Sequence, residues 1–146
     1  MIVIHDLAEA VTTDLPVWEG QKDKASKHQA ELEARQHLCR NIDPETAQEW
    51  QAVWEEYERR ESSEAQFVKI IDTFDVVTQH NAAPLSTWDD NDYLWQLNEM
   101  QDAFFNADPK LRQLKDALDE WSIAKVKEVD KLDKLDQPAL KRRTER

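Results

Sequence analysis

Glycine and cysteine are almost absent from this chain of 146 residues, which contains one of each. The single cysteine, Cys39, excludes an internal disulfide framework and favours a reducing compartment, so a cytoplasmic location is expected. The chain also lacks any apolar run of about 18 residues and any charged-then-apolar leader with a small-residue cleavage site. The sequence therefore predicts neither membrane insertion nor secretion.

Positive charge is also scarce, because 19 Lys and Arg residues face 31 Asp and Glu residues and the formal net charge is −12. A polynucleotide partner is not expected, since tracking a phosphate backbone requires a basic surface. A small phosphorylated ligand stays compatible, because a metal ion and one or two nearby cations can outweigh distant acidic groups. The basic cluster Lys141, Arg142, Arg143 and Arg146 is expected to be a disordered, solubilising tail.

Helix-favouring residues dominate the composition, and strand signals are rare. The predicted fold is all-α, a helical bundle of about five to seven helices. We expect a helical domain over residues 1–121 and a charged helix and tail over 122–146. Apolar periodicity, caps and prolines place the helices at residues 2–11, 21–40, 44–60, 64–81, 93–106 and 109–134.

The chemistry-bearing residues begin with the adjacent pair His5 and Asp6, followed by Glu9. Imidazole and carboxylate groups suit Mn, Co, Fe or Zn and leave coordination positions for water and a phosphate oxygen. On the expected helix, Glu9 is three residues beyond Asp6 and four beyond His5, so all three groups share one face. A His-Asp pair alone is common by chance, so further residues must support a metal site.

Further support comes from three more segments: Asp14-Leu15-Pro16, Trp54-Glu55-Glu56-Tyr57-Glu58, and the stretch SSEAQFVKIIDTFD from Ser62 to Asp75. Together with the doublet, they resemble the HD-domain 5'-deoxynucleotidases. Members of this family are small helical proteins that hydrolyse deoxynucleoside 5'-monophosphates with a divalent metal. The resemblance extends from about residue 2 to residue 79 and weakens beyond it. The aromatic residues Trp50, Trp54 and Tyr57 recur at helical spacing, which predicts core positions rather than a ligand platform.

The resemblance implies that His5, Asp6 and Asp72 are metal ligands, with Mn, Co, Fe, Mg or Zn as the ion. It also implies that Glu9 and Asp14 are the acids that act on water and on the leaving group. The expected substrate is a deoxynucleoside 5'-monophosphate.

Lys69 lies one helical turn before Asp72, where it could meet the substrate phosphate or simply pair as a solvated cation with Glu64 or Asp72. The expected buried stripe of this helix places Asp72 beside the core. It consists of Phe67, Ile70, Ile71, Phe74 and Val77.

The sequence departs from the family pattern at its start. The family carries an earlier histidine on a preceding helix, in a segment that also supplies an Arg and an aromatic residue to the nucleotide pocket, and the chain starts too late to include it. The chain is then either N-terminally shortened or a divergent member with weakened or lost catalysis. None of His28, His37 and His80 lies in a matching segment, so each is expected at the surface or in helix packing. Either a homodimer or a rearranged N-terminus would cover the apolar flank of the first helix.

Three hypotheses from different classes follow. The first is a metal-dependent phosphomonoesterase acting on deoxynucleoside 5'-monophosphates. The second is a catalytically silent relative that binds nucleotide or metal, and the third is a helical protein-interaction module. Metal binding separates the third from the others, and turnover separates the first from the second.

Overall fold

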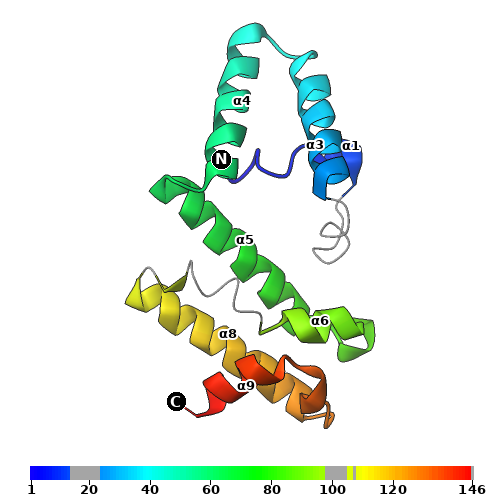
Figure 1. The fold of residues 1–146 in the computed structure, drawn as a ribbon, viewed down its shortest axis with the longest axis vertical. Helices are drawn as coiled ribbons and strands as arrows, with labels where there is room; N and C mark the ends of the chain where they lie inside the picture. Colours follow the sequence, from blue (N-terminus) through cyan, green and yellow to red (C-terminus); the bar gives the residue numbers. More distant parts are fainter. Residues whose placement is uncertain (14–23, 98–104, 107, 146) are drawn as a thin grey trace. The chain divides into compact units, whose positions relative to one another are not determined.

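The computed structural model describes residues 1–13, 24–97, 105–106 and 108–145, all in helices, turns and connecting segments (Figure 1). No strand occurs in these ranges, which confirms the all-α prediction. The α-helices are α1 (Glu9–Thr12), α3 (Lys24–Cys39), α4 (Pro44–Arg59), α5 (Ser63–Ala82), α6 (Asp90–Trp95), α8 (Pro109–Lys127) and α9 (Gln137–Thr144), and two 3₁₀ helices, η1 (Leu85–Thr87) and η3 (Leu132–Lys134), lie between them.

The chain forms two compact units, Met1–Val68 and Lys69–Arg146, and the boundary between them lies within α5. The domain boundary expected after residue 121 stays a prediction. That position falls inside α8, which continues to Lys127.

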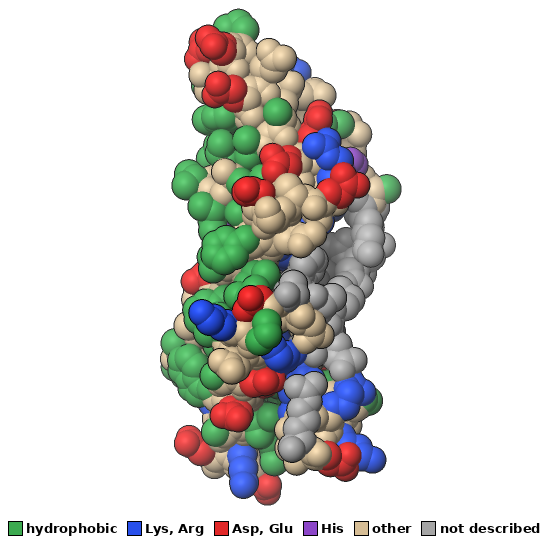
Figure 2. All heavy atoms as spheres, turned by 90° about the vertical axis from the view of Figure 1, so that its left-hand side faces the viewer, with side chains coloured by type: hydrophobic (Ala, Val, Ile, Leu, Met, Phe, Trp, Pro, Cys, Tyr) green, Lys and Arg blue, Asp and Glu red, His purple; other side chains and the backbone are tan. Residues whose placement is uncertain are grey.

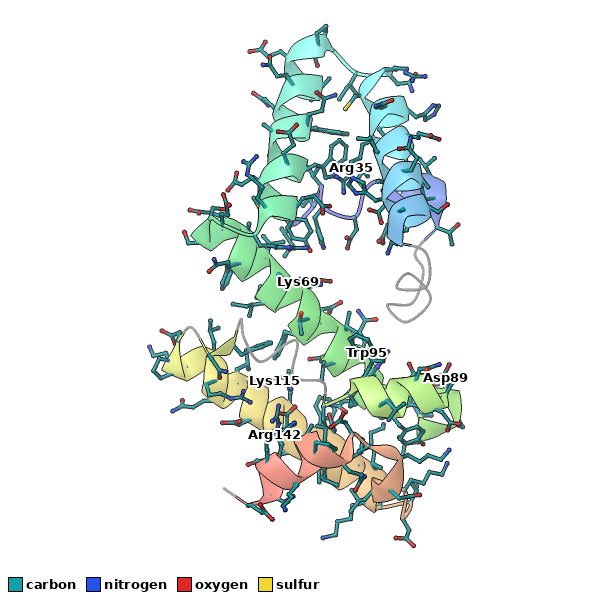
Figure 3. All side chains as sticks on the ribbon, in the orientation of Figure 1. Arg35, Lys69, Asp89, Trp95, Lys115 and Arg142 are labelled. Carbon is teal, nitrogen blue, oxygen red and sulfur yellow. The ribbon has the colours of Figure 1, made fainter. Side chains whose placement is uncertain are left out.

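The first unit is built on the antiparallel pair α3 and α4, with α1 against α3 (Figure 1). Helix α4 begins as expected, because Pro44 occupies the first turn and the Asp43 side chain accepts a hydrogen bond from the Thr46 backbone N–H. This bond also lowers the pKa of the Asp43 carboxyl. Arg35 extends from α3 into the space between the two helices (Figure 3), where its Nη2 lies 2.7 Å from Glu58 Oε1.

The helix expected over residues 2–11 is wrong in its first part. Residues 2–8 form hydrogen-bonded turns, and the α-helix is confined to Glu9–Thr12. The turns are closed by short-range backbone bonds such as Leu7 N–H to the Ile4 carbonyl at 3.0 Å. Three consecutive β-branched residues, Ile2, Val3 and Ile4, weaken helix propensity here. The chain therefore follows tertiary contacts rather than a regular helix.

Helix α5 confirms the predicted helix over 64–81 but corrects its buried face. Phe67 was expected in the core, yet its side chain is 55% exposed. The residues that are buried on this helix are Ala65, Val68, Ile70, Thr73, Val77 and Asn81. Asp72 precedes buried Thr73 and is itself partly exposed, so its expected place beside the core is confirmed.

The second unit has an apolar cluster formed by Trp88, Tyr93, Leu97, Val126, Leu135 and Ala139. A buried polar network links three of its helices, because the Gln96 amide donates to Ser122 Oγ at 2.9 Å and to Asn81 Oδ1 at 3.1 Å. The helix expected over 93–106 begins earlier, at Asp90, where Asp89 and Asp92 form a capping box. Most of its expected second half lies outside the described residues.

The C-terminal expectations are wrong in two respects. The helix predicted over 109–134 ends at Lys127, beyond which Asp130 adopts a left-handed φ of 56°. Of the predicted disordered tail, Lys141, Arg142 and Arg143 instead lie in helix α9, and Arg146 lies outside the described residues. The Arg143 side chain is only 4% exposed and places Nε 2.5 Å from the buried Asp119 carboxylate of α8. The same carboxylate pairs with buried Lys115, which Figure 3 labels on α8. Because Asp119 offers a buried partner for a terminal cation, packing orders a segment that composition alone marks as solvated.

Acidic, basic and hydrophobic side chains are interspersed on the face shown in Figure 2. No patch of one sign dominates that view. Among the helices that the structure describes, none combines the length and the apolar character that a membrane crossing requires.

Candidate metal centre

The His5–Asp6 doublet lies in the turns that precede α1, in the first unit. His5 Nδ1 is 2.8 Å from the Ile2 carbonyl oxygen. A carbonyl only accepts hydrogen bonds, so Nδ1 donates to Ile2, and Nε2 is the ring nitrogen that faces Asp6. Nε2 lies 2.8 Å from Asp6 Oδ2. The doublet therefore directs an imidazole nitrogen and a carboxylate oxygen at the same point.

This donor pair fits a divalent metal. Imidazole nitrogen and carboxylate oxygen are both donors that divalent metals accept, and here Nε2 and Oδ2 lie 2.8 Å apart, as an ion pair does. A histidine that binds a metal commonly donates its other ring N–H to a backbone carbonyl, as His5 does to Ile2. The imidazole is largely buried, whereas the Asp6 carboxylate is 53% exposed, so the pair remains open to ligands on the Asp6 side.

Helix α4 supports the doublet through two aromatic residues one turn apart. Trp54 is almost fully buried, and its indole Nε1–H donates to the Ile4 carbonyl at 2.7 Å. Tyr57, which is also buried, packs edge-on against the His5 ring with the centroids 4.8 Å apart. Both residues occupy the core positions that the sequence predicts. Their additional role, holding the backbone before His5 and the ring of His5, was missed because it depends on contacts about 50 residues apart in sequence.

The two expected acids have different outcomes. Glu9 opens α1, and its backbone N–H bonds to the Asp6 carbonyl at 2.8 Å. It therefore follows the doublet by one turn, as expected, although through a turn rather than a continuous helix. Asp14 lies outside the described residues.

Asp72 and Lys69 lie on α5, within the second unit. The Lys69 ammonium is 2.6 Å from Asp72 Oδ2, and both side chains are partly exposed. This ion pair is the alternative that the sequence left open for Lys69. A lysine at this distance neutralises the carboxylate and can still rotate toward a phosphate, because its ammonium is mobile on a flexible stem. The roles of both residues in a site stay predictions.

The remaining histidines occupy the positions expected for surface and packing residues. His28 and His37 are exposed on α3. His80 is partly buried, with Nδ1 3.3 Å from the Gln96 amide oxygen.

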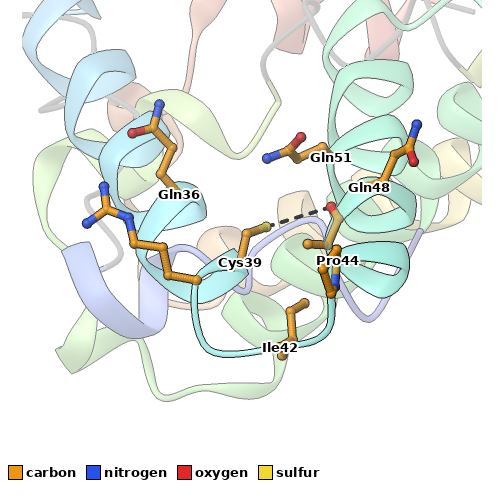
Figure 4. Close-up of a pocket in the computed structure, with 8 residues that line it drawn as sticks. Gln36, Cys39, Ile42, Pro44, Gln48 and Gln51 are labelled. Carbon is orange, nitrogen blue, oxygen red and sulfur yellow. Dashed lines mark hydrogen bonds between the residues drawn. The ribbon is translucent and has the colours of Figure 1, made fainter.

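A shallow pocket in the first unit lies where α3 meets α4 (Figure 4). Its lining residues are Gln36, Cys39, Arg40, Ile42, Pro44, Ala47, Gln48 and Gln51. The Cys39 thiol donates to the Ala47 carbonyl at 3.8 Å. Neutral amides and apolar groups form most of the lining, and no carboxylate or histidine is among these residues, so the pocket offers no acid-base pair.

Comparison with known proteins decides the family. The HD domain family matches residues 1–106, which is most of the chain and includes the doublet, α4 and α5. The chain belongs to the HD domain family.

Curated relatives of this HD domain share about a third of its residues over about half of its length. The 5'-deoxynucleotidase HDDC2 of Danio rerio is 34% identical over 79 residues, which are 54% of this chain and 39% of that protein. The human protein of the same name is 32% identical over 79 residues, 54% of this chain and 38% of its own length. The 5'-deoxynucleotidase hdd1 of Schizosaccharomyces pombe is 35% identical over 81 residues, 53% of this chain and 40% of that protein.

The matched segments thus span about two fifths of the length of these curated relatives. No solved structure gave a significant match to the chain.

Proposed function

We propose that this HD domain is a metal-dependent phosphomonoesterase that hydrolyses deoxynucleoside 5'-monophosphates to deoxynucleosides and phosphate. The observation that carries the proposal is the His5–Asp6 pair, whose nitrogen and oxygen donors lie 2.8 Å apart, with the other ring nitrogen bonded to the Ile2 carbonyl. The family match supports the reaction class. The substrate class rests on the relatives, which are named as 5'-deoxynucleotidases.

In this proposal His5, Asp6 and Asp72 hold the metal ion. All three offer the nitrogen and carboxylate donors that Mn, Co, Fe, Mg or Zn accept, with imidazole favouring the transition metals. Such an ion supplies Lewis acidity at the phosphoryl oxygens and makes neighbouring water more acidic. His5 would bind through Nε2, because its Nδ1 is bonded to the Ile2 carbonyl.

Glu9 and Asp14 handle the protons of the reaction. We assign Glu9 to accept a proton from the attacking water, because Glu9 lies one turn after Asp6. Asp14 is assigned to the leaving 5'-oxygen, which needs a proton as the phosphorus–oxygen bond breaks. Lys69 balances the negative charge of Asp72 and of the incoming phosphate.

The proposal includes a cytoplasmic location, since the single cysteine offers no disulfide framework and fits a reducing compartment. It places no polynucleotide among the partners. The net charge of −12 would repel a phosphate backbone.

The decisive experiment measures phosphate release by this chain from a panel of deoxynucleoside and ribonucleoside 5'-monophosphates, after EDTA treatment and with Mn²⁺ or Co²⁺ added back. The Asp72→Ala variant serves as the blank. Asp75→Ala is the matched control, because it makes the same change one turn further along α5 at an exposed carboxylate. We expect metal-dependent release that is lost in Asp72→Ala and retained in Asp75→Ala.

Three other results would change the assignment. Metal-dependent release that survives in Asp72→Ala would remove Asp72 from the site. Binding of Mn²⁺ without release from any member of the panel would indicate a non-catalytic HD domain that binds metal or nucleotide. Release from ribonucleotides as fast as from deoxynucleotides would overturn the substrate class.

A further inference from the structure

The residue that ends α4, Arg60, lies against Tyr57, the aromatic residue that packs against His5. Arg60 is the C-cap of α4 and places its guanidinium carbon 3.4 Å from the centroid of the Tyr57 ring. Tyr57 in turn packs edge-on against His5 at 4.8 Å. A single ring therefore contacts a permanent cation and the imidazole that presents Nε2 to Asp6.

The backbone of Arg60 is held in place from both sides. Its N–H bonds to the Glu56 carbonyl at 3.3 Å, and its carbonyl accepts a hydrogen bond from the Gln66 amide at 3.1 Å. Its φ of 57° is left-handed, which is uncommon for a residue with a side chain and ends the helix sharply. The position of the guanidinium over Tyr57 is thus anchored by the junction of α4 and α5.

The contacts of Arg60 indicate that the Tyr57 ring is the main partner of its charge. Nη1 is shielded from solvent, and no hydrogen-bond acceptor within the described residues satisfies it. A guanidinium stacked on an aromatic face is attracted by the negative potential of the ring, most strongly where water is excluded. The neighbouring Arg59, by contrast, is 55% exposed and lies 3.9 Å from Glu55.

We propose that Arg60 is a positioning residue of the metal centre, because its stacked guanidinium holds the Tyr57 ring against His5 and so fixes the orientation of the imidazole. The consequence for metal binding rests on the proposed function. The contact between Arg60 and Tyr57, and its effect on the orientation of His5, are independent of the proposed function.

The test uses the whole chain and three variants. Arg60→Met removes the charge and keeps an apolar stem, Arg60→Lys keeps a cation, and Arg59→Met is the matched control with the same loss of charge one residue earlier. The first readout is the ring-proton NMR signal of His5 in the metal-free protein, assigned with His5→Gln. The second is direct Mn²⁺ binding, followed by the paramagnetic resonance signal of free Mn²⁺.

We expect Arg60→Met to move the His5 signal, because the ring current of Tyr57 acts on it at 4.8 Å. The signals of His28 and His37, exposed on α3, stay in place if the fold is intact. We also expect about two- to fivefold weaker Mn²⁺ binding. Arg60→Lys should recover part of both effects, and Arg59→Met should show neither.

An unchanged His5 signal in Arg60→Met would overturn the proposal, as would equal displacement in Arg59→Met. Displacement of all histidine signals in Arg60→Met would mean that this variant does not fold. The test then uses Arg60→Lys, and an unchanged His5 signal in that variant would overturn the proposal. If the wild-type chain binds no Mn²⁺, the proposed metal site at His5, Asp6 and Asp72 is wrong. The metal-free His5 signal still decides the role of Arg60.

Discussion

Replacing Trp54 by Phe tests how α4 holds the doublet. The change removes the hydrogen bond from the indole to the Ile4 carbonyl, which at 2.7 Å connects α4 to the residue preceding His5. Loss of one such bond costs about 1 kcal/mol, and the smaller ring leaves a gap at a side chain that is only 1% exposed. Removing the extra indole atoms from such a site costs about another 1–2 kcal/mol. The unfolding free energy should fall by about 2–3 kcal/mol in total.

Urea unfolding, monitored by circular dichroism, measures this loss. The urea concentration at the unfolding midpoint should fall by about 1 M. Trp50→Phe is the control, because it removes the same atoms from a partly buried ring on the same helix and leaves the Trp54–Ile4 hydrogen bond in place. Mn²⁺ affinity should also weaken in Trp54→Phe more than in Trp50→Phe. Equal midpoints for the two variants would refute the argument that the bond to Ile4 holds the doublet.

Two further predictions concern the second unit. Asp119→Asn should lower the free energy of unfolding of this unit by about 3–5 kcal/mol, measured by urea unfolding. The substitution leaves the buried cations Lys115 and Arg143 without their shared carboxylate. A loss below about 1 kcal/mol would mean that this charge does not hold α9. The Lys134 ammonium donates a hydrogen bond to Asp90 and lowers the pKa of that carboxyl below its ordinary value of 3.8. The contribution of Asp90 to stability is therefore full above its unfolded-state pKa and is lost as the pH falls through the folded-state pKa. Carboxyl ¹³C NMR should show the pKa of Asp90 rising in Lys134→Met, and an unchanged pKa would contradict the pairing.

Local sequence signals predicted those features that depend on near neighbours. The Asp43–Pro44 start of α4 follows from a side-chain acceptor and a proline without N–H, and both act within one turn. The position of Asp72 beside the core follows from the period of α5, even though Phe67 proved exposed. The period locates a face, but which residues of that face are covered depends on what packs against it.

Some residues of the candidate site could likewise be predicted from the sequence, and others could not. His5, Asp6 and Glu9 are recognisable from sequence because their residue types and spacing are those of metal and proton chemistry. The roles of Trp54 and Tyr57 could not be predicted, since the same apolar periodicity marks any core aromatic. Only the tertiary contacts to Ile4 and His5 distinguish them from other buried rings.

The sequence by itself determined that this chain is helical, where most helices begin, and that it carries an HD doublet, because propensity, caps and motif chemistry are local properties. Only the tertiary structure decided that residues 2–8 form turns rather than a helix, and that the basic C-terminus folds as α9. At the C-terminus a long-range partner outweighs local preference, and at the N-terminus it adds to a helix propensity that β-branched residues already weaken. The Trp54 indole binds the Ile4 carbonyl, and the buried Asp119 carboxylate binds Arg143.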